Sequence, residues 1–445
     1  MPNKIVAKIK DAGVVGAGGA GFPTHIKVDS EVQIVLGNGA SCEPLLMSDI
    51  YLMEKMPNLI FKGIQLVMES SGAKEGILCL KAKHDAAWKS LEEVRKRDFP
   101  GLEMFELGDF YPAGDEQVLV YEVTGKVVPE GGIPLEVGVI VSNVETLLNI
   151  ERAVGEGTPV TRRYLTVTGE VQRPNITSVP IGVPISQVID HAGGALIDDF
   201  LVVIGGPMMG IVTSDLSMPI TKTTSAIIVL PKEHNVVQTR IRDPKKVWNI
   251  TKTVCCQCSR CTDLCPRHLL GHRLEPHRIM RALGWSANLP QEVLEDVLIC
   301  SECGICEKYA CPMMISPREV NAQIKKELAS RGVKRKSKEN QYRPSEFRDV
   351  RKVPTQRLME RLDITKYDTH PSFKEFSENI KEVKIPLKQH IGDPARPLVR
   401  EGDRVKEGDL IGDIPDKVVG AKVHSSINGV VTFVGEYVTI EVVNR

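Results

Sequence analysis

A tandem pattern of cysteines constrains this chain more than any other feature of its sequence. The two runs read Cys255-x2-Cys258-x2-Cys261-x3-Cys265-Pro266 and Cys300-x2-Cys303-x2-Cys306-x4-Cys311-Pro312. Three thiolates separated by two residues, with a remote fourth before proline, form the ligand pattern of a cubane iron–sulfur cluster, and the fourth cysteine binds the other cluster of the pair. The pattern therefore predicts two [4Fe-4S] clusters, one on Cys255, Cys258, Cys261 and Cys311, and the other on Cys300, Cys303, Cys306 and Cys265.

Zinc is the alternative for these cysteines, but four-cysteine zinc sites favour two separated pairs over triplets. Eight of the eleven cysteines are assigned to clusters, which leaves Cys42, Cys79 and Cys256. We expect Cys256, which lies beside a ligand, to be a packed thiol. Clusters and free thiols together indicate a reducing compartment, so the expected location is the bacterial cytoplasm. Between the runs, His268 and His272 could bind a metal from one helix face, although a solvated helix is the expectation.

The length and charge of the chain exclude several classes of protein. With 445 residues it exceeds a single hydrophobic core, so we expect several domains. The formal net charge is zero, which does not indicate a basic surface for nucleic acid or an anionic membrane. The first residues lack the apolar core of a signal peptide, and no apolar run approaches the ~18 residues of a transmembrane helix. We therefore expect no nucleic-acid partner and no direct insertion into a membrane.

A glycine-rich loop near the N-terminus is the first sign of a cofactor. Residues 13–23 read GVVGAGGAGFP, and so many glycines let backbone amides turn sharply toward a phosphate. Gly16-x-Gly18-x-x-Gly21 matches the dinucleotide fingerprint, but the preceding residues form an amphipathic helix pattern rather than a strand. The residues that follow, 24–27, read as exposed and non-helical. The loop predicts a phosphate-bearing cofactor, with a flexible turn as the alternative.

The rest of the N-terminal region alternates strands and helices. Strands are expected at 32–37, 76–80 and 138–142, with helices at 57–71 and 86–96, which predicts an α/β domain with a largely parallel sheet. A further helix should follow Asp115 and Glu116, where carboxylates favour the helix N-terminus. These two residues either cap that helix or bind a nucleotide or flavin.

Four motifs of this region resemble, in order, the flavin-binding domain shared by the NADH-oxidising subunit of respiratory complex I and the C subunit of Rnf-type electron-transport complexes. They are GAGGAGFPTHIK (16–27), NGASCEP (38–44), YPAGDE (111–116) followed by TGKVVPEGGIP (124–134), and VSNVETLLNIERAV (141–154). In that family these loops hold FMN, with NADH stacked on its ring. The resemblance implies an FMN site that uses Gly16, Gly18, Gly19, Gly21, Lys27, Asn38, Glu43, Asn143 and Thr146, with the Lys27 cation near the flavin or its phosphate.

The remaining segments resemble other modules of the same proteins. Residues 163–230 read as a soluble-ligand-binding β-grasp (SLBB) domain, in which 205–210 forms either a packed bend or a flat apolar surface. Residues 331–357 read as a solvated, charged connector, and a helix is expected at 355–362. Residues 380–445 resemble a barrel-sandwich domain of the RnfC type, without a lysine at the turn where biotinyl or lipoyl carriers are modified.

The predicted fold is therefore multidomain, α/β plus β. We divide it into an FMN- and NADH-binding α/β domain, a β-grasp domain, a helical dicluster ferredoxin domain, a charged linker with a helix, and a C-terminal barrel-sandwich hybrid domain. The limits of these units are 1–160, 161–235, 245–330, 331–378 and 379–445.

With its barrel-sandwich domain at the C-terminus, the layout resembles the cobalamin reductases of propanediol-utilisation microcompartments. The resemblance implies electron flow from NADH through FMN and two clusters to a corrinoid, and partners such as a corrinoid adenosyltransferase and microcompartment shell proteins or enzymes. It also implies a location inside a microcompartment. A peripheral subunit of an Rnf-like complex and an electron donor to another reductase are the alternatives. No catalytic residue is predicted.

Overall fold

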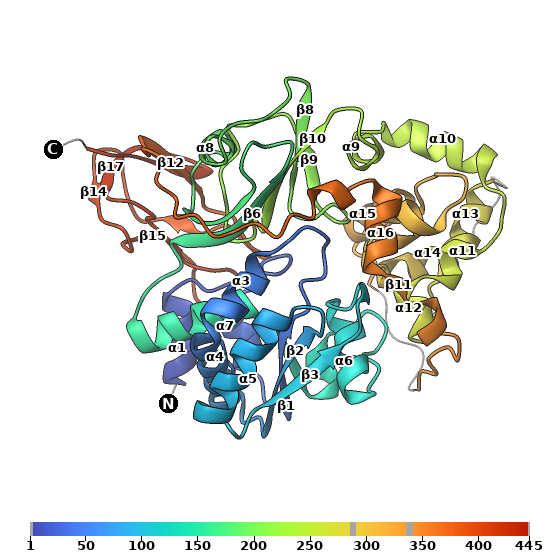
Figure 1. Ribbon diagram of the computed structural model, residues 1–445, viewed down its shortest axis with the longest axis horizontal. Helices are drawn as coiled ribbons and strands as arrows, with labels where there is room; N and C mark the ends of the chain where they lie inside the picture. The colour runs from blue at the N-terminus through green and yellow to red at the C-terminus, as the bar shows by residue number, and fades with distance from the viewer. Residues whose placement is uncertain (1–2, 285–290, 335–340, 444–445) are drawn as a thin grey trace.

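A computed structural model of the chain describes residues 3–284, 291–334 and 341–443. Figure 1 shows four bodies: an N-terminal α/β domain (blue to cyan), a β domain above it (green), a helical domain (yellow to orange) and a second β domain (red). No helix in these described ranges is long and apolar enough to cross a membrane.

The N-terminal domain is built on a parallel sheet in the order β3-β2-β1-β5. Its residues alternate between two cores: along β1, Val35 joins one core, whereas Ile34 and Leu36 join the other. Apolar residues on both faces are the signature of a sheet covered by helices on both sides. The strands are β1 (Ile34–Gly39), β2 (Glu75–Lys81), β3 (Glu103–Leu107) and β5 (Val139–Asn143).

Helices cover this sheet much as the periodicity predicted. The helix expected at 57–71 is α4, whose apolar residues recur at helical spacing and which ends at Gly72 in the left-handed conformation. Residues 24–27, expected to be exposed and non-helical, instead belong to the short helix α2, in which Thr24 and Val28 lie one turn apart and are both buried. The helices are α1 (Lys4–Asp11), α2 (Thr24–Val28), α3 (Ser48–Lys55), α4 (Pro57–Ser71), α5 (Asp85–Asp98), α6 (Glu116–Thr124) and α7 (Val144–Glu151).

The second domain is a mixed five-stranded sheet in the order β7-β6-β10-β8-β9, in which only β6 and β10 are parallel. The loop 205–210 joins β8 to β9, with Met208 buried and Met209 about half exposed, so it combines a packed bend with an exposed side chain. The elements are β6 (Arg162–Gly169), β7 (Asn175–Pro180), α8 (Ile185–His191), β8 (Phe200–Ile204), β9 (Ile211–Thr213) and β10 (Ala226–Pro231).

The helical domain carries both cysteine runs, and we call it the cysteine domain (residues 235–330). The helix expected around His268 and His272 ends at Leu269. His272 is buried, and its Nε2 lies 2.9 Å from the Val128 carbonyl oxygen. The expectation of a solvated helix was therefore wrong. The helices are α9 (Asn235–Arg240), α10 (Pro244–Val254), α11 (Arg260–Asp263), α12 (Pro266–Leu269), α13 (Pro276–Gly284), α14 (Gln291–Glu295) and α15 (Pro317–Ser330).

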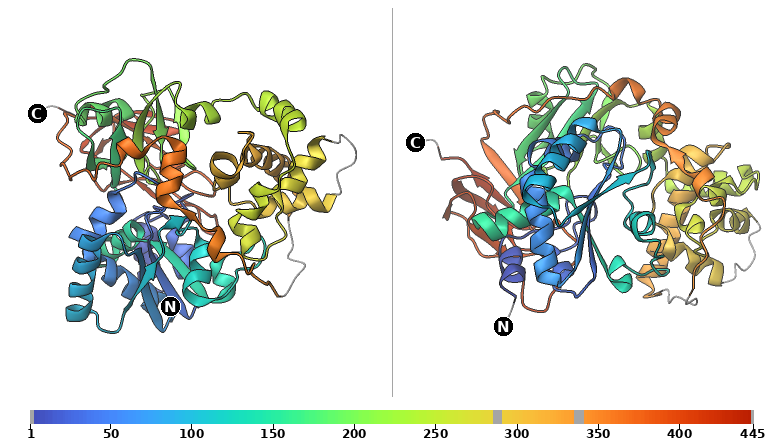
Figure 2. Two further views of the ribbon diagram at one scale, coloured as in Figure 1. Left: turned by 45° about the vertical axis from the view of Figure 1, so that its right-hand side comes forward. Right: turned by 60° about the horizontal axis from the view of Figure 1, so that its bottom comes forward.

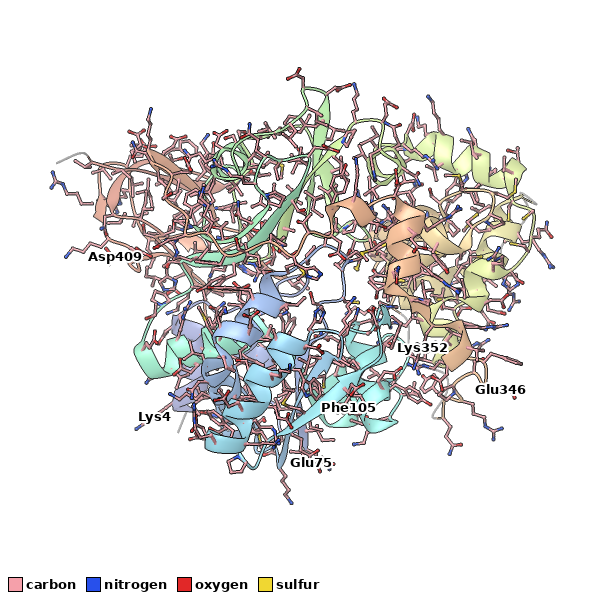
Figure 3. The ribbon with its side chains drawn as sticks, in the orientation of Figure 1. Lys4, Glu75, Phe105, Glu346, Lys352 and Asp409 are labelled. Carbon is pink, nitrogen blue, oxygen red and sulfur yellow. The ribbon has the colours of Figure 1, made fainter. Side chains whose placement is uncertain are left out.

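The connector packs against other domains over much of its described part, contrary to the expected solvated linker; residues 335–340 lie outside the described ranges. β11 (Val353–Pro354) pairs antiparallel with β4 (Phe110–Tyr111) of the N-terminal domain, which buries Val353. Lys352 lies at the junction between the N-terminal and cysteine domains (Figure 3), where its ammonium lies 3.0 Å from the Glu122 carboxylate. The helix α16 (Thr355–Leu362) follows as predicted.

The C-terminal β domain consists of two small sheets, β12-β18-β17-β14 and β13-β15-β16. It packs against the start of the chain, where Ile391 N–H donates to the Gly21 carbonyl and Lys422 pairs with Asp11. Figure 2 shows this red domain beside α1. The strands are β12 (Glu382–Pro386), β13 (Arg396–Pro397), β14 (Arg404–Val405), β15 (Leu410–Asp413), β16 (Val423–His424), β17 (Gly429–Val434) and β18 (Tyr437–Glu441).

Candidate functional site

The strand order marks the carboxyl ends of β1 and β5 as the place where a ligand crevice is expected. From β1 the chain adds β2 and then β3 on one side, and β5 is added on the other side of β1. The connections that follow β1 and lead into β5 therefore run to opposite sides of β1. Ligands of open parallel sheets bind at the carboxyl ends of the strands at such a point. Asn38 and Asn143 are paired in register at these ends, so two predicted site residues lie side by side.

Both asparagine side chains hold the loops around the crevice. Asn38 Nδ2 donates to the Gly114 carbonyl (2.9 Å), and its Oδ1 accepts from the Ala40 N–H. Asn143 caps helix α7 by accepting from the Glu145 N–H, while its Nδ2 donates to Asp49 (2.7 Å). The resemblance implied flavin contacts for both residues, which stay a prediction, and the structure shows that their side chains fix the loops at the carboxyl ends of β1 and β5.

The glycine loop (residues 13–22) lies over this crevice and is anchored from below. Thr146 Oγ1 accepts from the Ala17 N–H at 2.9 Å. A Cβ on Gly18 would come within 3.0 Å of Asn143, so this position accepts only glycine without a shift. Gly19 has no protein atom within 4 Å of a Cβ position. The loop therefore presents a bare stretch of backbone, which fits a phosphate-bearing cofactor.

A buried ion pair below the loop was missed by sequence reasoning. Arg163 Nη1 lies 2.5 Å from Glu145 Oε2, both side chains are almost fully buried, and Arg163 Nη2 donates to the Ala17 carbonyl. Its Nε donates to the Thr224 carbonyl, so each guanidinium nitrogen has an acceptor. Burial raises the pKa of Glu145, and Arg163 opposes that shift. An arginine within a strand gives no sequence signal for this role, because its partner lies on another domain.

Two predicted site residues beside the crevice, Lys27 and Glu116, bind each other. Lys27 Nζ donates to Glu116 Oε1 (3.0 Å) and to the Val141 carbonyl (2.9 Å). The adjacent Asp115 caps helix α6 by accepting from the N–H groups of Gln117 and Val118, which confirms the predicted capping role, while its predicted contact with a flavin stays a prediction.

The Glu43 carboxylate accepts hydrogen bonds from the second domain. Its two carboxylate oxygens accept from the N–H groups of Met208 (2.9 Å) and Met209 (2.8 Å) in loop 205–210. Burial raises the pKa of Glu43 to about 7, and the Met208 amide and the Lys308 ammonium oppose this shift. This carboxylate links the edge of the crevice to the β-grasp sheet.

Four cysteines of the expected second cluster line one cavity. The walls of this cavity include Cys265, Cys300, Cys303 and Cys306, which we call the inner set. Asn321 Nδ2 lies 3.7 Å and the Glu302 N–H nitrogen 3.4 Å from Cys300 Sγ, and hydrogen bonds of this kind tune cluster potentials. Glu302 and Gly304 adopt positive φ, which lets the loop wrap around the cavity.

The other four cysteines form a more exposed group, the outer set (Cys255, Cys258, Cys261 and Cys311). Burial raises the pKa of Cys261 to about 12, and the nearby thiols of Cys255, Cys258, Cys265 and Cys311 raise it further. Burial also raises the pKa of Cys311, whose neighbours include Cys258 and Cys255. The fourth cysteine of each run thus lies near the triplet of the other run.

The donor chemistry of both sets fits iron–sulfur clusters. In the described ranges, no three His, Cys, Asp or Glu side chains are arranged to hold a single metal ion. Cys256 is exposed rather than packed, so that expectation was wrong; it follows helix α10 at the surface, where no core covers it.

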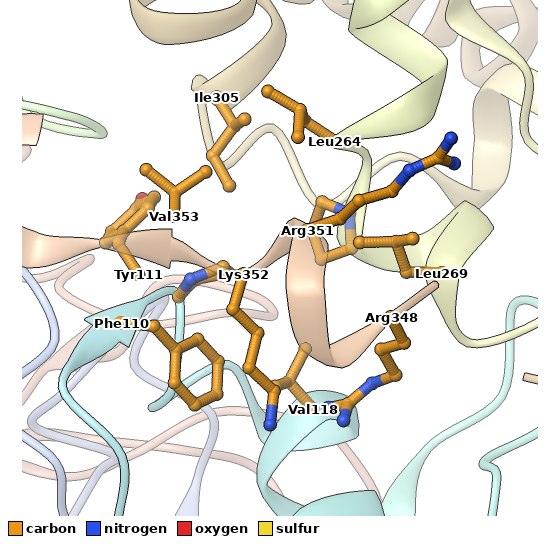
Figure 4. Close-up of a pocket in the computed structure, with 12 residues that line it drawn as sticks. Phe110, Tyr111, Val118, Leu264, Leu269, Ile305, Arg348, Arg351, Lys352 and Val353 are labelled. Carbon is orange, nitrogen blue, oxygen red and sulfur yellow. The ribbon is translucent and has the colours of Figure 1, made fainter. Parts of the chain in front are cut away.

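Two contacts join the inner set to the N-terminal domain. Tyr111 Oη donates to the Cys303 carbonyl (2.7 Å), and the Arg267 guanidinium binds the Asp115 carboxylate with two hydrogen bonds of 2.6 and 2.9 Å. A second cavity lies beside them (Figure 4), lined by Phe110, Tyr111, Pro112, Val118, Leu264, Pro266, Leu269, Ile305, Arg348, Arg351, Lys352 and Val353. The cations at its rim are paired, Arg348 and Lys352 with Glu122 and Arg351 with Asp263.

Four protein-family models match the chain in the order of its domains. They are the Nuo51 FMN-binding domain (residues 9–152), the SLBB domain (164–212), the 4Fe-4S dicluster domain (254–316) and the RnfC barrel sandwich hybrid domain (366–444). Together with the fold, they define a multidomain flavo-iron–sulfur protein. The predicted fold class and the predicted FMN and [4Fe-4S] cofactors are confirmed.

Two curated relatives align with nearly the whole chain. The cobalamin reductase PduS of Salmonella typhimurium is 42% identical over 434 residues, covering 98% of this chain and 95% of the relative. The cobalamin reductase PduS of Citrobacter freundii is 41% identical over 429 residues, covering 96% and 94%. The chain therefore belongs to the family of these cobalamin reductases.

More distant relatives share part of the chain. The C subunit of the Na⁺-translocating ferredoxin:NAD⁺ oxidoreductase complex of Acetobacterium woodii is 36% identical over 266 residues, covering 59% of this chain and 57% of that relative. A crystal structure of an NAD⁺-reducing [NiFe]-hydrogenase in the H2-reduced state matches with a TM-score of 0.50 and 23% identity, covering 73% of this chain and 62% of that one. The hydrogenase likeness shows the fold alone.

Proposed function

We propose that this protein is an NADH-dependent cobalamin reductase that reduces a corrinoid toward cob(I)alamin. The observation that carries the proposal is the 42% identity to the Salmonella typhimurium cobalamin reductase over 98% of the chain. Bound FMN accepts electrons in pairs and releases them singly, and clusters carry one electron each, which suits a cobalt that changes charge by one. The protein supplies binding, orientation and the electrostatic setting of these groups.

The residues proposed to bind FMN are those around the crevice. Gly18 and Gly19 offer their backbone to the phosphate side, and Lys27 supplies a cation that Glu116 holds in place. Thr146 fixes the glycine loop by accepting from the Ala17 N–H, and Asn143 caps helix α7 beside it by accepting from the Glu145 N–H. The remaining proposed contacts are Gly16, Gly21, Asn38, Glu43 and Asp115.

For the clusters, we propose that the inner set and the outer set each bind one [4Fe-4S] cluster. The shared cavity of the inner set and the proximity of Cys311 to Cys258 and Cys255 support this crossed ligation. Its test is Cys265→Ser, which should impair only the cluster on Cys300, Cys303 and Cys306. Selective loss of the cluster on the first cysteine triplet would contradict the crossed arrangement.

The cellular setting belongs to the proposal as well. By the resemblance of its layout, the protein acts with a corrinoid adenosyltransferase and with microcompartment shell proteins or enzymes, in the bacterial cytoplasm and inside a microcompartment. The domain limits at 160/161, 235/245, 330/331 and 378/379 are likewise our division of the chain.

The activity is tested with the anaerobically purified holoprotein. NADH and cob(II)alamin are added, and the cobalt absorbance is followed to the cob(I)alamin spectrum. No reduction by protein with full flavin and iron content would contradict the proposal. It would favour a partner-dependent electron-transfer subunit, which the 36% identity to the C subunit of the Acetobacterium woodii complex makes the second candidate.

The flavin site has its own test with a matched control. Gly19 and Gly101 both have no atom within 4 Å of a Cβ position, so neither glycine is needed for packing. Gly19→Trp should fill the proposed phosphate cradle and abolish FMN content while the iron content stays normal. Gly101→Trp should keep both cofactors. Retention of FMN by Gly19→Trp would place the flavin elsewhere.

A further inference from the structure

We propose that the two cysteine sets act in a fixed order: the inner set receives electrons from the FMN-binding domain, and the outer set passes them to the corrinoid at the protein surface. The inference rests on the proposed function for the identity of donor and acceptor. The proposal places the inner set at the donor end of the electron path and the outer set at the acceptor end. The cysteine spacing alone does not distinguish the two sets in this way.

The inner set is bound to the FMN-binding domain from several directions. Tyr111, three residues before the crevice residue Gly114, donates its hydroxyl proton to the carbonyl of Cys303. Asp115, next to Gly114, forms a bidentate ion pair with Arg267, two residues after Cys265. The wall of the crevice and the loops of the inner set are thus in direct contact.

Loop 205–210 adds a second bridge between the crevice and the inner set. Glu43 accepts from the amides of Met208 and Met209, as described above. On its other side the loop meets the inner set, because Lys308 Nζ donates to the Pro207 carbonyl (2.9 Å) and a Cβ on Gly304 would lie 3.1 Å from the Met208 carbonyl oxygen. The loops that carry the inner set therefore contact both the N-terminal domain and loop 205–210 of the β-grasp domain.

The outer set lies toward solvent. In the outer set Cys258 is exposed, Cys255 and Cys261 are half-buried and Cys311 is buried. In the inner set Cys300 is half-buried and the other three cysteines are buried, so the outer set is the more exposed of the two. Figure 1 shows α10, which leads directly into Cys255, running away from the β-grasp sheet to the far end of the cysteine domain. The two sets adjoin each other, because helix α11, which carries Cys261, packs against the helical turn Cys306–Ala310.

Exposed apolar side chains flank the outer set. Ile250 lies in the helix before Cys255, and Met313 and Met314 follow Cys311, each with more than two fifths of its surface exposed. Methionine side chains adapt to large and irregular partners. A corrinoid is broad and partly apolar, so this edge offers it a contact surface beside the exposed ligand Cys258.

The electron balance closes with the two substrates named. Oxidation of one NADH gives NAD⁺, one proton and two electrons. The electrons cross the two sets one at a time, since each cluster carries a single electron. Two cob(II)alamin molecules each take one electron to give cob(I)alamin, and the proton goes to solvent.

The order is tested by removing one cluster at a time. In Cys258→Ala, NADH should still reduce the remaining cluster, seen by electron paramagnetic resonance of freeze-quenched samples, while cobalamin reduction is lost. In Cys300→Ala, NADH should bleach the flavin absorbance but leave the remaining cluster oxidised. The reverse pattern overturns the order. This measurement needs no corrinoid, so it stands even where cobalamin reduction fails in the wild type.

The surface step is tested without removing a cluster, in case these variants misfold. Cys256 is exposed between two outer-set ligands and is not itself a proposed ligand. A polyethylene-glycol maleimide attached to it in the holoprotein should abolish cobalamin reduction but leave NADH reduction of both clusters unchanged. Cys256→Ser, treated with the same reagent, should keep full activity. Undiminished cobalamin reduction by the labelled protein overturns the assignment of the outer set.

Discussion

The ion pair between Arg267 and Asp115 should hold the cysteine domain against the FMN-binding domain, and replacing Arg267 with methionine tests this. The pair has two short hydrogen bonds, and its side chains are only 8% and 13% exposed. A bidentate, desolvated pair of this kind is strongly affected by the loss of one partner, because the remaining charge stays buried.

The structure sets the size of the effect. Removing one partner of a buried pair costs roughly 3–5 kcal/mol. The Asp115 carboxylate keeps its two hydrogen bonds from the α6 backbone, so we expect the lower end, about 3 kcal/mol. Each 1.4 kcal/mol changes an equilibrium constant about tenfold, so local opening of the interface should increase about a hundredfold.

Hydrogen–deuterium exchange of the holoprotein measures this opening directly. Amides of α12 and of the first turn of α6 should exchange faster, whereas those of α4 should not change. Arg331→Met is the matched control, because its pair with Glu327 is 68% and 61% exposed and contributes about 0.5 kcal/mol or less. Asp115→Asn and the double variant complete a double-mutant cycle.

Unchanged exchange in α12 of Arg267→Met would refute the reasoning. Additive effects in the cycle would also refute it, because they would show that the two side chains act separately. A general rise in exchange that includes α4 would indicate global destabilisation instead of an opened interface.

Three further outcomes follow from local geometry. Gly63→Ala should cost about 1–3 kcal/mol in chemical unfolding, because its Cβ would collide with the Leu147 carbonyl; an unchanged midpoint contradicts this. Thr146→Val should cost about 1–3 kcal/mol by leaving the buried Ala17 amide unpaired, measured as faster exchange of the glycine loop and lower FMN content. Burial lowers the pKa of Lys222 from 10.5 to about 7, so only the unfolded chain binds this proton between those pH values. The stability of the folded protein that depends on Lys222 is therefore full above the unfolded pKa and is lost as the pH falls toward 7. From pH 7 to pH 10, the unfolding free energy of wild type should rise relative to that of Lys222→Met by up to about 1.4 kcal/mol per pH unit. A difference between the two proteins that does not change with pH contradicts the shift.

Local chemistry made much of the fold predictable. The apolar spacing in residues 57–71 predicted α4 over the same range. The β-branched run predicted a strand at 32–37, and the structure has it at Ile34–Gly39. The cysteine spacing predicted two cluster sites, and the dicluster match confirms that prediction. Each of these signals lies within a few residues of the element that it specifies.

Signals that depend on distant partners were missed. β11 pairs with β4 across about half of the chain, so the connector looked solvated from its own composition. Arg163 can be buried because the Glu145 carboxylate neutralises its charge and the Ala17 carbonyl accepts a hydrogen bond from it. Both partners are distant in sequence, so the strand that carries Arg163 gives no signal for them. His272 was misread for the same reason, since its acceptor belongs to the N-terminal domain.

The contact between the glycine loop and the C-terminal β domain has a consequence for biosynthesis. Lys422 reaches Asp11 across 411 residues of sequence, and Gly21 accepts a hydrogen bond from Ile391. At 5–20 residues per second, a ribosome needs roughly 20–80 s to make that interval. The nascent loop therefore lacks this support until the C-terminal β domain has been translated, so flavin loading should follow the synthesis of that domain rather than occur on the emerging N-terminal domain.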